Sequence, residues 1–316
     1  MHTYLVTGAA GFIGSNLVQE LVKQGKRVLA LDNLSTGRLE NIIPFLSDIE
    51  FIRGDIRDLD MVRKVMAGVE VVLHQAALPS VPRSISDPLA SNEVNVTGTL
   101  NILTAARDAK VARVVCASSS SVYGNTTTLP KVEVMPVDPL SPYAVSKLAA
   151  ERYCRSFSQV YGLPTISLRY FNVFGPRQDP SSQYSAVIPK LIAMMLEGKP
   201  PTIYGDGLQS RDFTYVDNVV RANLIAAEAD PSITGYFNVG CGTRFSLLDL
   251  VQQLNTILRT NLNPVHLPSL AGEVKDSQAS IEKIRIALGF TPTVPFKLGL
   301  ERTVAFYHNQ VLAEVL

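Results

Sequence analysis

Three features that would each place this sequence in a particular class of protein are scarce or missing. It has only three cysteines among 316 residues, Cys116, Cys154 and Cys241, which lie far apart and form no C-x-x-C pair. This pattern argues against a disulfide framework or a zinc site and suits a reducing compartment. Charge of either sign is not in excess, because 29 lysines and arginines nearly balance 28 aspartates and glutamates. We therefore expect no metal ion and no nucleic-acid partner.

Long apolar runs are also missing from the sequence. No run approaches the roughly 20 apolar residues that a membrane-spanning helix needs. The first apolar residues, 4–6, lead directly into a glycine turn where a signal peptide would continue. We expect a cytoplasmic protein with no membrane partner. A hydrophobic content of 46% with 18% charged residues predicts a globular chain with a sizeable core.

What the sequence does contain is an alternation of short β-branched runs and longer helical patterns. The expected strands cover residues 4–7, 27–31, 50–53, 71–74, 113–117 and 165–168. The expected helices between them cover residues 12–24, 59–66, 89–108 and 142–161. Repeated strand–helix units predict an α/β protein with a Rossmann-type doubly wound parallel sheet, in which ligands bind at the carboxyl ends of the strands.

The alternation stops after about Phe171, where prolines become frequent. Helical patterns follow at residues 216–228, 247–258, 281–288 and 298–307. We expect two parts, a dinucleotide-binding domain at residues 1–172 and a smaller, mostly helical substrate-binding region at residues 173–316. The second part should cover the crevice of the sheet.

A glycine-rich turn, TGAAGFIG at residues 7–14, follows the first expected strand. Gly8, Gly11 and Gly14 let the backbone turn tightly and approach a pyrophosphate, whose charge rests on the helix N-terminus. Asp32 ends the second strand eighteen residues beyond Gly14. A carboxylate there accepts hydrogen bonds from an adenosine ribose and favours NAD over NADP. The alternative role for Asp32 is to cap a turn or a helix.

Other strand ends offer further contacts for a dinucleotide. Residues 54–56 close the third strand and would face the adenine, while residues 75–77 place small side chains beside the expected dinucleotide path. Taken alone, these are an aspartate turn and an alanine-rich bend. The NAD-binding residues predicted from strand ends are Gly8, Gly11, Phe12, Ile13, Gly14, Asp32, Asn33, Asp55, Ile56, Gln75, Ala76 and Ala77.

The sequence PLSPYAVSK at residues 139–147 predicts the start of a helix, with Ser141 as the N-cap and Pro142 at the first helical position. Tyr143 and Lys147 are four residues apart and share one face of that helix. A tyrosine base must lose its proton, which costs roughly 4 kcal/mol at pH 7 unless a cation such as Lys147 helps. In isolation, an aromatic side chain and a solvated lysine on a helix surface remain the simpler interpretation.

The combination of these motifs is more specific than any one of them. TGAAGFIG, the strand-end Asp32, the serine run CASSSSVYG at residues 116–124 and Tyr143-x-x-x-Lys147 together resemble the extended short-chain dehydrogenase/reductase family. Three later segments resemble the sugar-nucleotide epimerases and dehydratases within that family: RYFNVFGPRQ (169–178), GDGLQSRDFTYVDNVV (205–220) and AGEVKDSQAS (271–280). The resemblance covers nearly the whole chain.

The resemblance implies a seven-stranded NAD-binding sheet, which the chain re-enters near residues 213–238. It also implies a homodimer that packs through the helices at residues 89–108 and 142–161. NAD should be bound tightly, because a cofactor that is regenerated in every cycle need not leave. Ser118, Tyr143 and Lys147 join the predicted NAD-binding set on this basis.

The catalytic residues that the resemblance implies are Ser119, Tyr143 and Lys147. Ser119 lies four residues before Tyr123, and its hydroxyl would hydrogen-bond O4 of the sugar and help to pass the proton to Tyr143. Ser120 and Ser121 would line the sugar pocket.

The serine run also bears on the reaction. Related 4,6-dehydratases carry Asp-Glu directly before Val-Tyr-Gly, and related decarboxylases keep a glutamate at the second position, whereas this chain has Ser120-Ser121. The resemblance therefore implies 4-epimerisation of a UDP-hexose by transient oxidation at C4. The alternatives left open are a UDP-glucuronate 4-epimerase, a sugar-nucleotide dehydratase or decarboxylase, and a non-enzymatic NAD-binding redox sensor.

The resemblance also implies a set of UDP-sugar contacts. Asn172 and Arg211 correspond to family residues at the diphosphate, Glu273 to an acid at the uridine ribose, and Arg83 would lie near the sugar. Arg211 has an alternative role in a surface salt bridge with Asp212.

One position departs from the family pattern. Leu270 stands where a second phosphate-binding arginine is usual, so nucleotide binding would be either weaker or assisted from elsewhere, by Arg244 or Lys275.

The size of the Ser277 side chain bears on which substituent at C2 of the sugar the protein accepts. It lies four residues after Glu273, where a small side chain leaves room for an N-acetyl group. Residues 277–279 and 181–190 also resemble the N-acetylhexosamine branch. We expect UDP-GlcNAc and UDP-GalNAc as substrates, with UDP-glucose and UDP-galactose also accepted.

Overall fold

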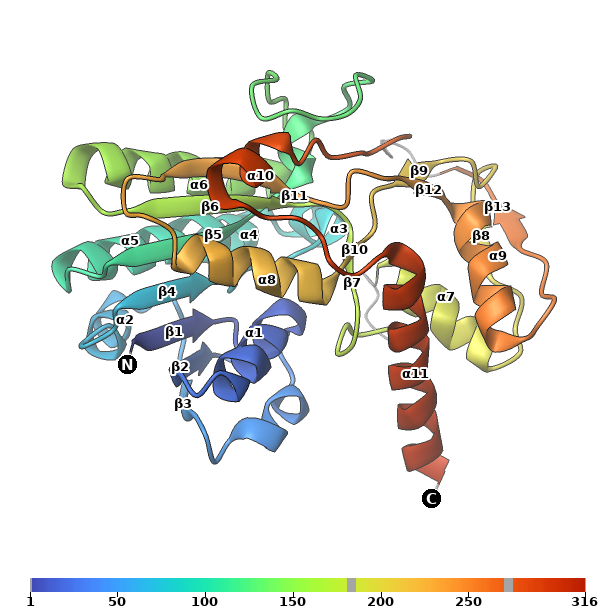
Figure 1. The fold of residues 1–316 in the computed structure, drawn as a ribbon, viewed down its shortest axis with the longest axis horizontal. Coiled ribbons are helices and arrows are strands. Elements are labelled where there is room, and N and C mark those ends of the chain that lie inside the picture. Colours follow the sequence, from blue (N-terminus) through green and yellow to red (C-terminus); the bar gives the residue numbers. More distant parts are fainter. Residues whose placement is uncertain (1, 181–185, 270–274, 316) are drawn as a thin grey trace.

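A parallel seven-stranded sheet forms the centre of the computed structural model, which describes residues 2–180, 186–269 and 275–315 (Figure 1). The strand order is β11-β6-β5-β4-β1-β2-β3. The strands are β1 (Thr3–Thr7), β2 (Arg27–Asp32), β3 (Glu50–Arg53), β4 (Val71–His74), β5 (Arg113–Ser119), β6 (Thr165–Tyr170) and β11 (Gly235–Val239). The central strands are buried almost throughout, as a parallel sheet covered on both faces requires. The predicted doubly wound sheet is confirmed.

Helices cover both faces of the sheet. On one face lie α1 (Phe12–Lys23) and α8 (Val216–Ala227), and their apolar residues join one large core cluster. On the other lie α2 (Leu59–Val65), α5 (Thr99–Asp108) and α6 (Pro142–Tyr161), whose apolar residues belong to a second cluster. The strand order reverses between β1 and β4, and a crevice at the carboxyl ends of the strands beside such a switch point is the usual ligand site in doubly wound folds.

The expected elements of the first half agree with the structure to within two residues, apart from the helix expected at residues 89–108. Three segments replace that helix: α4 (Pro88–Asn92), a π turn (Glu93–Gly98) and α5. A further short helix, α3 (Val81–Ser86), precedes them and was not expected. The prediction of one uninterrupted helix was therefore wrong.

Contacts of Asn95 accompany the π turn. Its Oδ1 accepts a hydrogen bond from the Leu78 N–H at 2.7 Å, and its Nδ2 donates to Leu78 O at 3.2 Å and to Ser146 Oγ at 3.0 Å. The extra residue of a π turn directs this buried amide inward to link two neighbouring segments. A hydrophobic pattern with a period of 3.6 residues does not reveal such a tertiary contact.

The rest of the chain combines helices with three short two-stranded ladders. The helices are α7 (Val187–Leu196), α9 (Leu247–Leu258), α10 (Glu282–Leu288) and α11 (Phe296–Val315). The ladders pair β7 (Val173–Phe174) with β10 (Thr214–Tyr215), β8 (Thr202–Tyr204) with β13 (Val265–Leu267), and β9 (Ser210–Arg211) with β12 (Phe245–Ser246). The sequence pattern predicted α8, α9, α10 and a shorter α11, but not α7 or the ladders. The proposed boundary near residue 172 stays a prediction.

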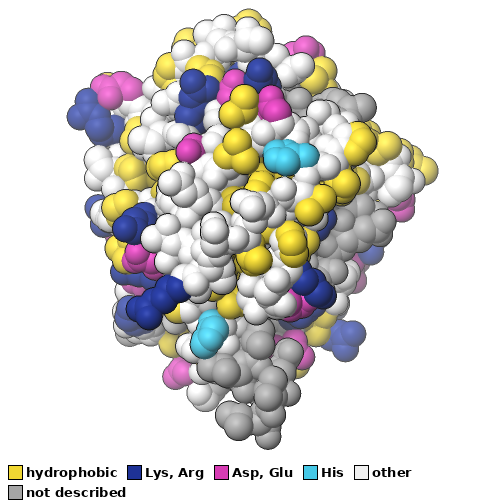
Figure 2. All heavy atoms as spheres, turned by 90° about the vertical axis from the view of Figure 1, so that its right-hand side faces the viewer, with side chains coloured by type: hydrophobic (Ala, Val, Ile, Leu, Met, Phe, Trp, Pro, Cys, Tyr) yellow, Lys and Arg dark blue, Asp and Glu magenta, His cyan; other side chains and the backbone are white. Residues whose placement is uncertain are grey.

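Short 3₁₀ helices lie beside two of the main strands. They are η1 (Leu39–Asn41) and η2 (Ile43–Phe45) after β2, and η4 (Ser120–Tyr123) directly after β5. On the face of the molecule formed by β8, β13 and α9, hydrophobic side chains lie among uncharged ones, and charges of both signs are scattered around them (Figure 2). None of the helices in the described ranges has both the length and the apolar character that crossing a membrane requires.

Candidate active site

A cavity of about 750 Å³ opens at the carboxyl ends of the central strands. Arg83 lies on its wall. So does every residue predicted from the sequence to bind NAD: Gly8, Gly11, Phe12, Ile13, Gly14, Asp32, Asn33, Asp55, Ile56, Gln75, Ala76, Ala77, Ser118, Tyr143 and Lys147. These residues follow five different strands, and the parallel sheet brings them together. The volume is within the range of cofactor sites.

The glycine turn after β1 leaves no space for side chains. A Cβ on Gly8 would lie 2.7 Å from the Ala76 backbone nitrogen, and Gly8 has a φ of +66° that other residues rarely adopt. A Cβ on Gly14 would lie 2.0 Å from the Gly8 carbonyl oxygen. The turn therefore presents bare backbone at the N-terminus of α1, which fits the close approach of a pyrophosphate.

Asp32 is held by the backbone at the end of β2. Its Oδ2 accepts a hydrogen bond from the Ala10 N–H at 2.9 Å, and its Oδ1 accepts one from the Leu34 N–H at 2.8 Å. Burial raises the pKa of Asp32, while these two hydrogen bonds lower it. A carboxylate has about four acceptor positions, so Asp32 can also accept hydrogen bonds from ribose hydroxyls on the cavity side. The capping role and the ribose role are thus compatible.

A second carboxylate lies beside it at the expected adenine end of the cavity. Asp55 accepts a hydrogen bond from Asn33 Nδ2 at 2.9 Å and forms an ion pair with Arg57 at 2.8 Å. Hydrogen bonding to Arg57 lowers the pKa of Asp55 to about 2. The glycine turn, Asp32 and Asp55 together fit the pyrophosphate and adenosine parts of NAD.

The helix that carries Tyr143 and Lys147 begins as predicted. Ser141 Oγ caps α6 by accepting a hydrogen bond from the Ala144 N–H at 3.2 Å. Lys147 is 7% exposed and its Nζ donates to the Ala117 carbonyl oxygen of β5 at 3.0 Å. An ammonium has three donors, so this bond leaves others for the cavity. Both side chains lie on the cavity wall, which excludes the interpretation of a solvated surface lysine.

The serines after β5 are arranged less simply than the sequence suggested. Ser118 lies on the cavity wall, but its hydroxyl donates to Glu151 Oε2 at 3.0 Å. Ser119 ends β5, and its Oγ accepts hydrogen bonds from the backbone N–H of Ser121 at 3.2 Å and from Ser121 Oγ at 2.9 Å. Ser120 and Ser121 begin η4. The roles proposed for Ser119, Ser120 and Ser121 at the sugar stay predictions, because these three serines are not among the residues that line the cavity.

The predicted substrate residues Arg211 and Ser277 lie beside each other, around Ser210. Arg211 Nη1 donates to the carbonyl oxygens of Ser210 and Lys275, both at 2.9 Å. The Ser277 N–H donates to Ser210 O at 3.0 Å, and Ser277 is 9% exposed. Strand β9 thus brings the two predicted substrate segments together.

The structure describes some of the other residues predicted to contact the substrate, and others lie outside the described residues. Asn172 lies two residues beyond the end of β6 and has a φ of +27°. Arg244, one of the two proposed helpers, forms an ion pair with Asp276 at 3.2 Å. Glu273, Leu270 and residues 181–185 lie outside the described residues.

Asp212, the alternative partner of Arg211, is fully buried. Its carboxylate accepts hydrogen bonds from the backbone N–H groups of Cys241, Gly242 and Ala279. Burial raises the pKa of Asp212 to about 6.

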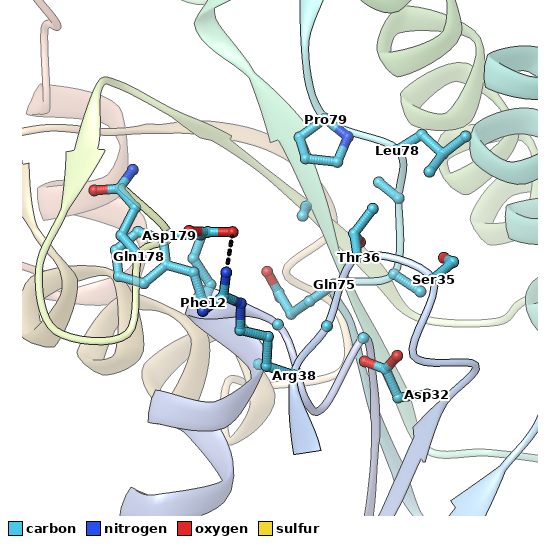
Figure 3. Close-up of a pocket in the computed structure, with 18 of the residues that line it drawn as sticks. Phe12, Asp32, Ser35, Thr36, Arg38, Gln75, Leu78, Pro79, Gln178 and Asp179 are labelled. Carbon is cyan, nitrogen blue, oxygen red and sulfur yellow. Dashed lines mark hydrogen bonds and ion pairs between the residues drawn. The ribbon is translucent and has the colours of Figure 1, made fainter. Parts of the chain in front are cut away.

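Sequence analysis missed two groups of residues on the cavity wall. The first group follows β2 and the second comes from the second half of the chain: Ser35, Thr36, Gly37 and Arg38, and Arg177, Gln178, Asp179, Phe306, Tyr307 and Gln310. Arg38 and Asp179 form an ion pair at 2.8 Å across the cavity (Figure 3). The motif at residues 169–178 was a signal for part of this group, whereas α11 carries no recognisable motif.

Within the described parts of the chain, no group of three or more His, Cys, Asp and Glu side chains is arranged to hold a metal ion.

A doubly wound sheet with a bare glycine turn, an aspartate at the end of β2 and a Tyr-x-x-x-Lys pair around one cavity defines an NAD-binding enzyme of the short-chain dehydrogenase/reductase type. The chain belongs to the NAD dependent epimerase/dehydratase family, whose model matches residues 4–240. It is 39% identical over 307 residues to a putative UDP-glucose 4-epimerase of Methanocaldococcus jannaschii, covering 96% of this chain and 98% of that protein.

Solved structures give the same assignment. The UDP-N-acetylglucosamine 4-epimerase from Methanobrevibacter ruminantium, in complex with UDP-N-acetylmuramic acid, is similar with a TM-score of 0.94 and 38% identity, covering 98% of this chain and 99% of that chain. The UDP-glucuronic acid 4-epimerase from Bacillus cereus, in complex with UDP-glucuronic acid and NAD, has a TM-score of 0.90 and 36% identity, with the same coverage. The predicted enzyme class, NAD-dependent UDP-sugar 4-epimerases, and the predicted NAD cofactor are confirmed.

Proposed function

We propose that this protein interconverts UDP-GlcNAc and UDP-GalNAc at C4 and also accepts UDP-glucose and UDP-galactose. The observation that carries the proposal is the position of Tyr143 and Lys147 on the wall of the cavity that also holds the NAD-binding residues. This position supports a role for Tyr143 as proton acceptor and for Lys147 as the neighbouring cation in the reaction of a bound sugar with the cofactor.

The proposed mechanism uses Tyr143 as the base. When bound, NAD supplies a reversible hydride acceptor for C4. Tyr143, as phenolate, takes the proton of the sugar O4 and later returns it, while Lys147 stabilises the phenolate by its positive charge. Ser119 donates a hydrogen bond to O4 and keeps the hydroxyl oriented during proton transfer. The 4-keto sugar rotates before reduction, so the configuration at C4 inverts and the mass of the sugar does not change.

The preference for N-acetylated substrates depends on Ser277. Its small side chain leaves space near C2 of the sugar, and its backbone bond to Ser210 places it beside Arg211, the proposed diphosphate ligand. Filling or leaving a small space of this kind is worth roughly 1–3 kcal/mol, so the discrimination against UDP-glucose should be modest.

UDP-glucuronate is the second candidate substrate. Arg83 lies on the cavity wall, where a guanidinium can pair with a sugar carboxylate, and one of the similar structures is a UDP-glucuronic acid 4-epimerase. Incubation of the pure protein with UDP-GlcNAc, UDP-glucose and UDP-glucuronate, with products resolved by NMR and mass spectrometry, tests both candidates. Exclusive turnover of UDP-glucuronate would replace the first proposal by the second. Loss of water or of CO₂ would instead indicate a dehydratase or a decarboxylase.

A further inference from the structure

A buried ion pair connects the helix of Tyr143 and Lys147 to the sheet. Glu151 accepts two hydrogen bonds from Arg169, from Nε to Oε2 at 2.8 Å and from Nη2 to Oε1 at 2.7 Å. The two side chains are 1% and 0% exposed. Glu151 lies four residues after Lys147, which lies four residues after Tyr143, so all three share one face of α6.

The same carboxylate also holds the end of β5. Ser118 Oγ donates to Glu151 Oε2 at 3.0 Å. The residue before Ser118 is Ala117, whose carbonyl oxygen accepts the hydrogen bond from Lys147 Nζ. Arg169 lies opposite Ser118 in the register of β5 and β6. Glu151 therefore joins α6 to two neighbouring strands beside the point at which Lys147 is held.

Aromatic rings fix the arginine of this pair. The Arg169 guanidinium lies 4.8 Å from the ring centroid of Tyr123 and 4.2 Å from that of Tyr236. Tyr123 is itself held by a hydrogen bond from its hydroxyl to Asn238 Oδ1 at 2.7 Å. Rings packed against a guanidinium restrict its rotation as well as attracting its charge.

Stability alone does not account for a pair buried to this degree. Two charges removed from water lose their hydration, and apolar side chains of similar volume often give equal or greater stability. A bidentate arginine–carboxylate pair differs from apolar packing in fixing orientation. Orientation matters in this place because a shift of about 1 Å in a reacting group can lower the rate by roughly 10²-fold.

We propose that Glu151 and Arg169 are positioning residues for the epimerase reaction. Their ion pair holds α6 in one rotation and one axial position against β5, so that the Tyr143 hydroxyl and the Lys147 ammonium keep a fixed relation to the end of β5. Neither residue lines the cavity. This inference rests on the proposed function, because it concerns the geometry of the proposed base.

The double variant Glu151→Leu/Arg169→Met tests the inference. It removes both charges and keeps the buried volume, so the melting temperature should stay within a few degrees of the parent value. We expect kcat for UDP-GlcNAc to fall at least ~10-fold, while KM and the amount of co-purified NAD stay within about twofold. An equal kcat in parent and double variant would overturn the inference.

A second variant keeps the test decisive if the double variant does not fold. Glu151→Gln retains the length of the side chain and one oxygen that can accept from Ser118 or Arg169, but it loses the charge. Its kcat should lie between those of the parent and the double variant, with KM unchanged. A Glu151→Gln enzyme with parental kcat would refute the positioning role even without the double variant.

Two controls separate positioning from general destabilisation. Glu282 and Arg285 form the same two-bond pair on the exposed surface of α10, at 2.6 Å and 3.0 Å, so Glu282→Leu/Arg285→Met should leave kcat unchanged. Arg113 is buried at the start of β5 and donates to three backbone carbonyls, so Arg113→Met should lower stability without lowering kcat. A comparable loss of kcat in Arg113→Met would overturn the inference.

These experiments also distinguish a failure of the proposed function from a failure of the positioning role alone. A parent protein that turns over no UDP-sugar would refute the proposed function and, with it, the positioning role. A parent protein that is active, with an equally active double variant, would refute the positioning role alone.

Discussion

The hydroxyl of Tyr143 and the ammonium of Lys147 lie one helical turn apart on the wall of the NAD cavity. Tyr143→Phe removes the proposed base and leaves the ring in place. We expect kcat to fall by at least ~10², with KM for UDP-sugars and the NAD content close to parental values. Initial rates with UDP-GlcNAc measure this, and near-normal turnover would exclude Tyr143 as the base.

Ser119 differs from the serines that follow it in its hydrogen bonds. Its Oγ accepts from both the N–H and the hydroxyl of Ser121, and a hydroxyl that accepts two bonds still has its own proton to donate. We expect Ser119→Ala to lower kcat more than Ser120→Ala or Ser121→Ala does. Rates of the three variants under identical conditions provide the comparison. Greatest sensitivity at Ser121 would show that the four-residue offset from Tyr123 assigns the wrong serine.

Ser277 controls the proposed space near C2 of the sugar. Ser277→Tyr should fill that space and abolish turnover of UDP-GlcNAc while sparing UDP-galactose. The ratio of kcat/KM for the two substrates measures the effect. If the native enzyme turns over only the hexoses without an acetamide group, the assignment of Ser277 to this pocket fails.

Two loops meet over the cavity, one after β2 and one after β7. The Arg38–Asp179 ion pair joins them, and Tyr307 of α11 donates a hydrogen bond to the Gln178 carbonyl oxygen beside them. We expect NAD to stay bound through purification, so denaturation of protein prepared without added nucleotide should release NAD or NADH. Absorbance and chromatography of the released nucleotide test this. Protein that is free of nucleotide and needs stoichiometric NAD for activity would contradict tight retention.

Elements with a strong pattern could be predicted from the sequence, and those that depend on tertiary contacts could not. The first six strands of the sheet and α6 carry β-branched runs or clear capping residues, so their limits agree closely with the structure. The seventh strand, β11, was expected only as a return of the chain to the sheet near residues 213–238. The π turn depends on Asn95 contacts with Leu78 and Ser146. The three short ladders have only two or three residues per strand, too few to show an alternation.

The same distinction applies to the site. That the proposed NAD-binding residues line one cavity could be predicted, because the carboxyl ends of parallel strands meet at one edge of the sheet. Asp179 and Tyr307 reach the cavity from segments far away in the sequence, and nothing periodic marks their approach. Glu151 and Arg169 were not singled out either, because a charged residue on an expected helix or strand gives no sign that it is buried.

At the scale of the whole molecule, apolar side chains are exposed on two neighbouring helices. Leu89 of α4 is 77% exposed, and on α6 Val145 and Tyr153 are 51% and 38% exposed. We propose a homodimer that packs through these helices and expect the native protein to elute with the mass of a dimer in light-scattering chromatography. Leu89→Asp/Tyr153→Asp should shift it toward the monomer. A native protein that is monomeric at micromolar concentration would refute this interface.

The π turn at Glu93–Gly98 determines which way the side chains after it face relative to those before it, within one nearly continuous helical segment. Each residue of an α-helix turns the chain by about 100°, so one additional residue in a turn rotates everything beyond it by that amount. Leu89 before the turn can therefore lie in solvent while Leu103 after it is fully buried in the core. Deleting a single residue here would restore an ordinary helix, but it would also rotate the residues after the turn relative to those before it. This segment should therefore tolerate substitutions far better than changes in length.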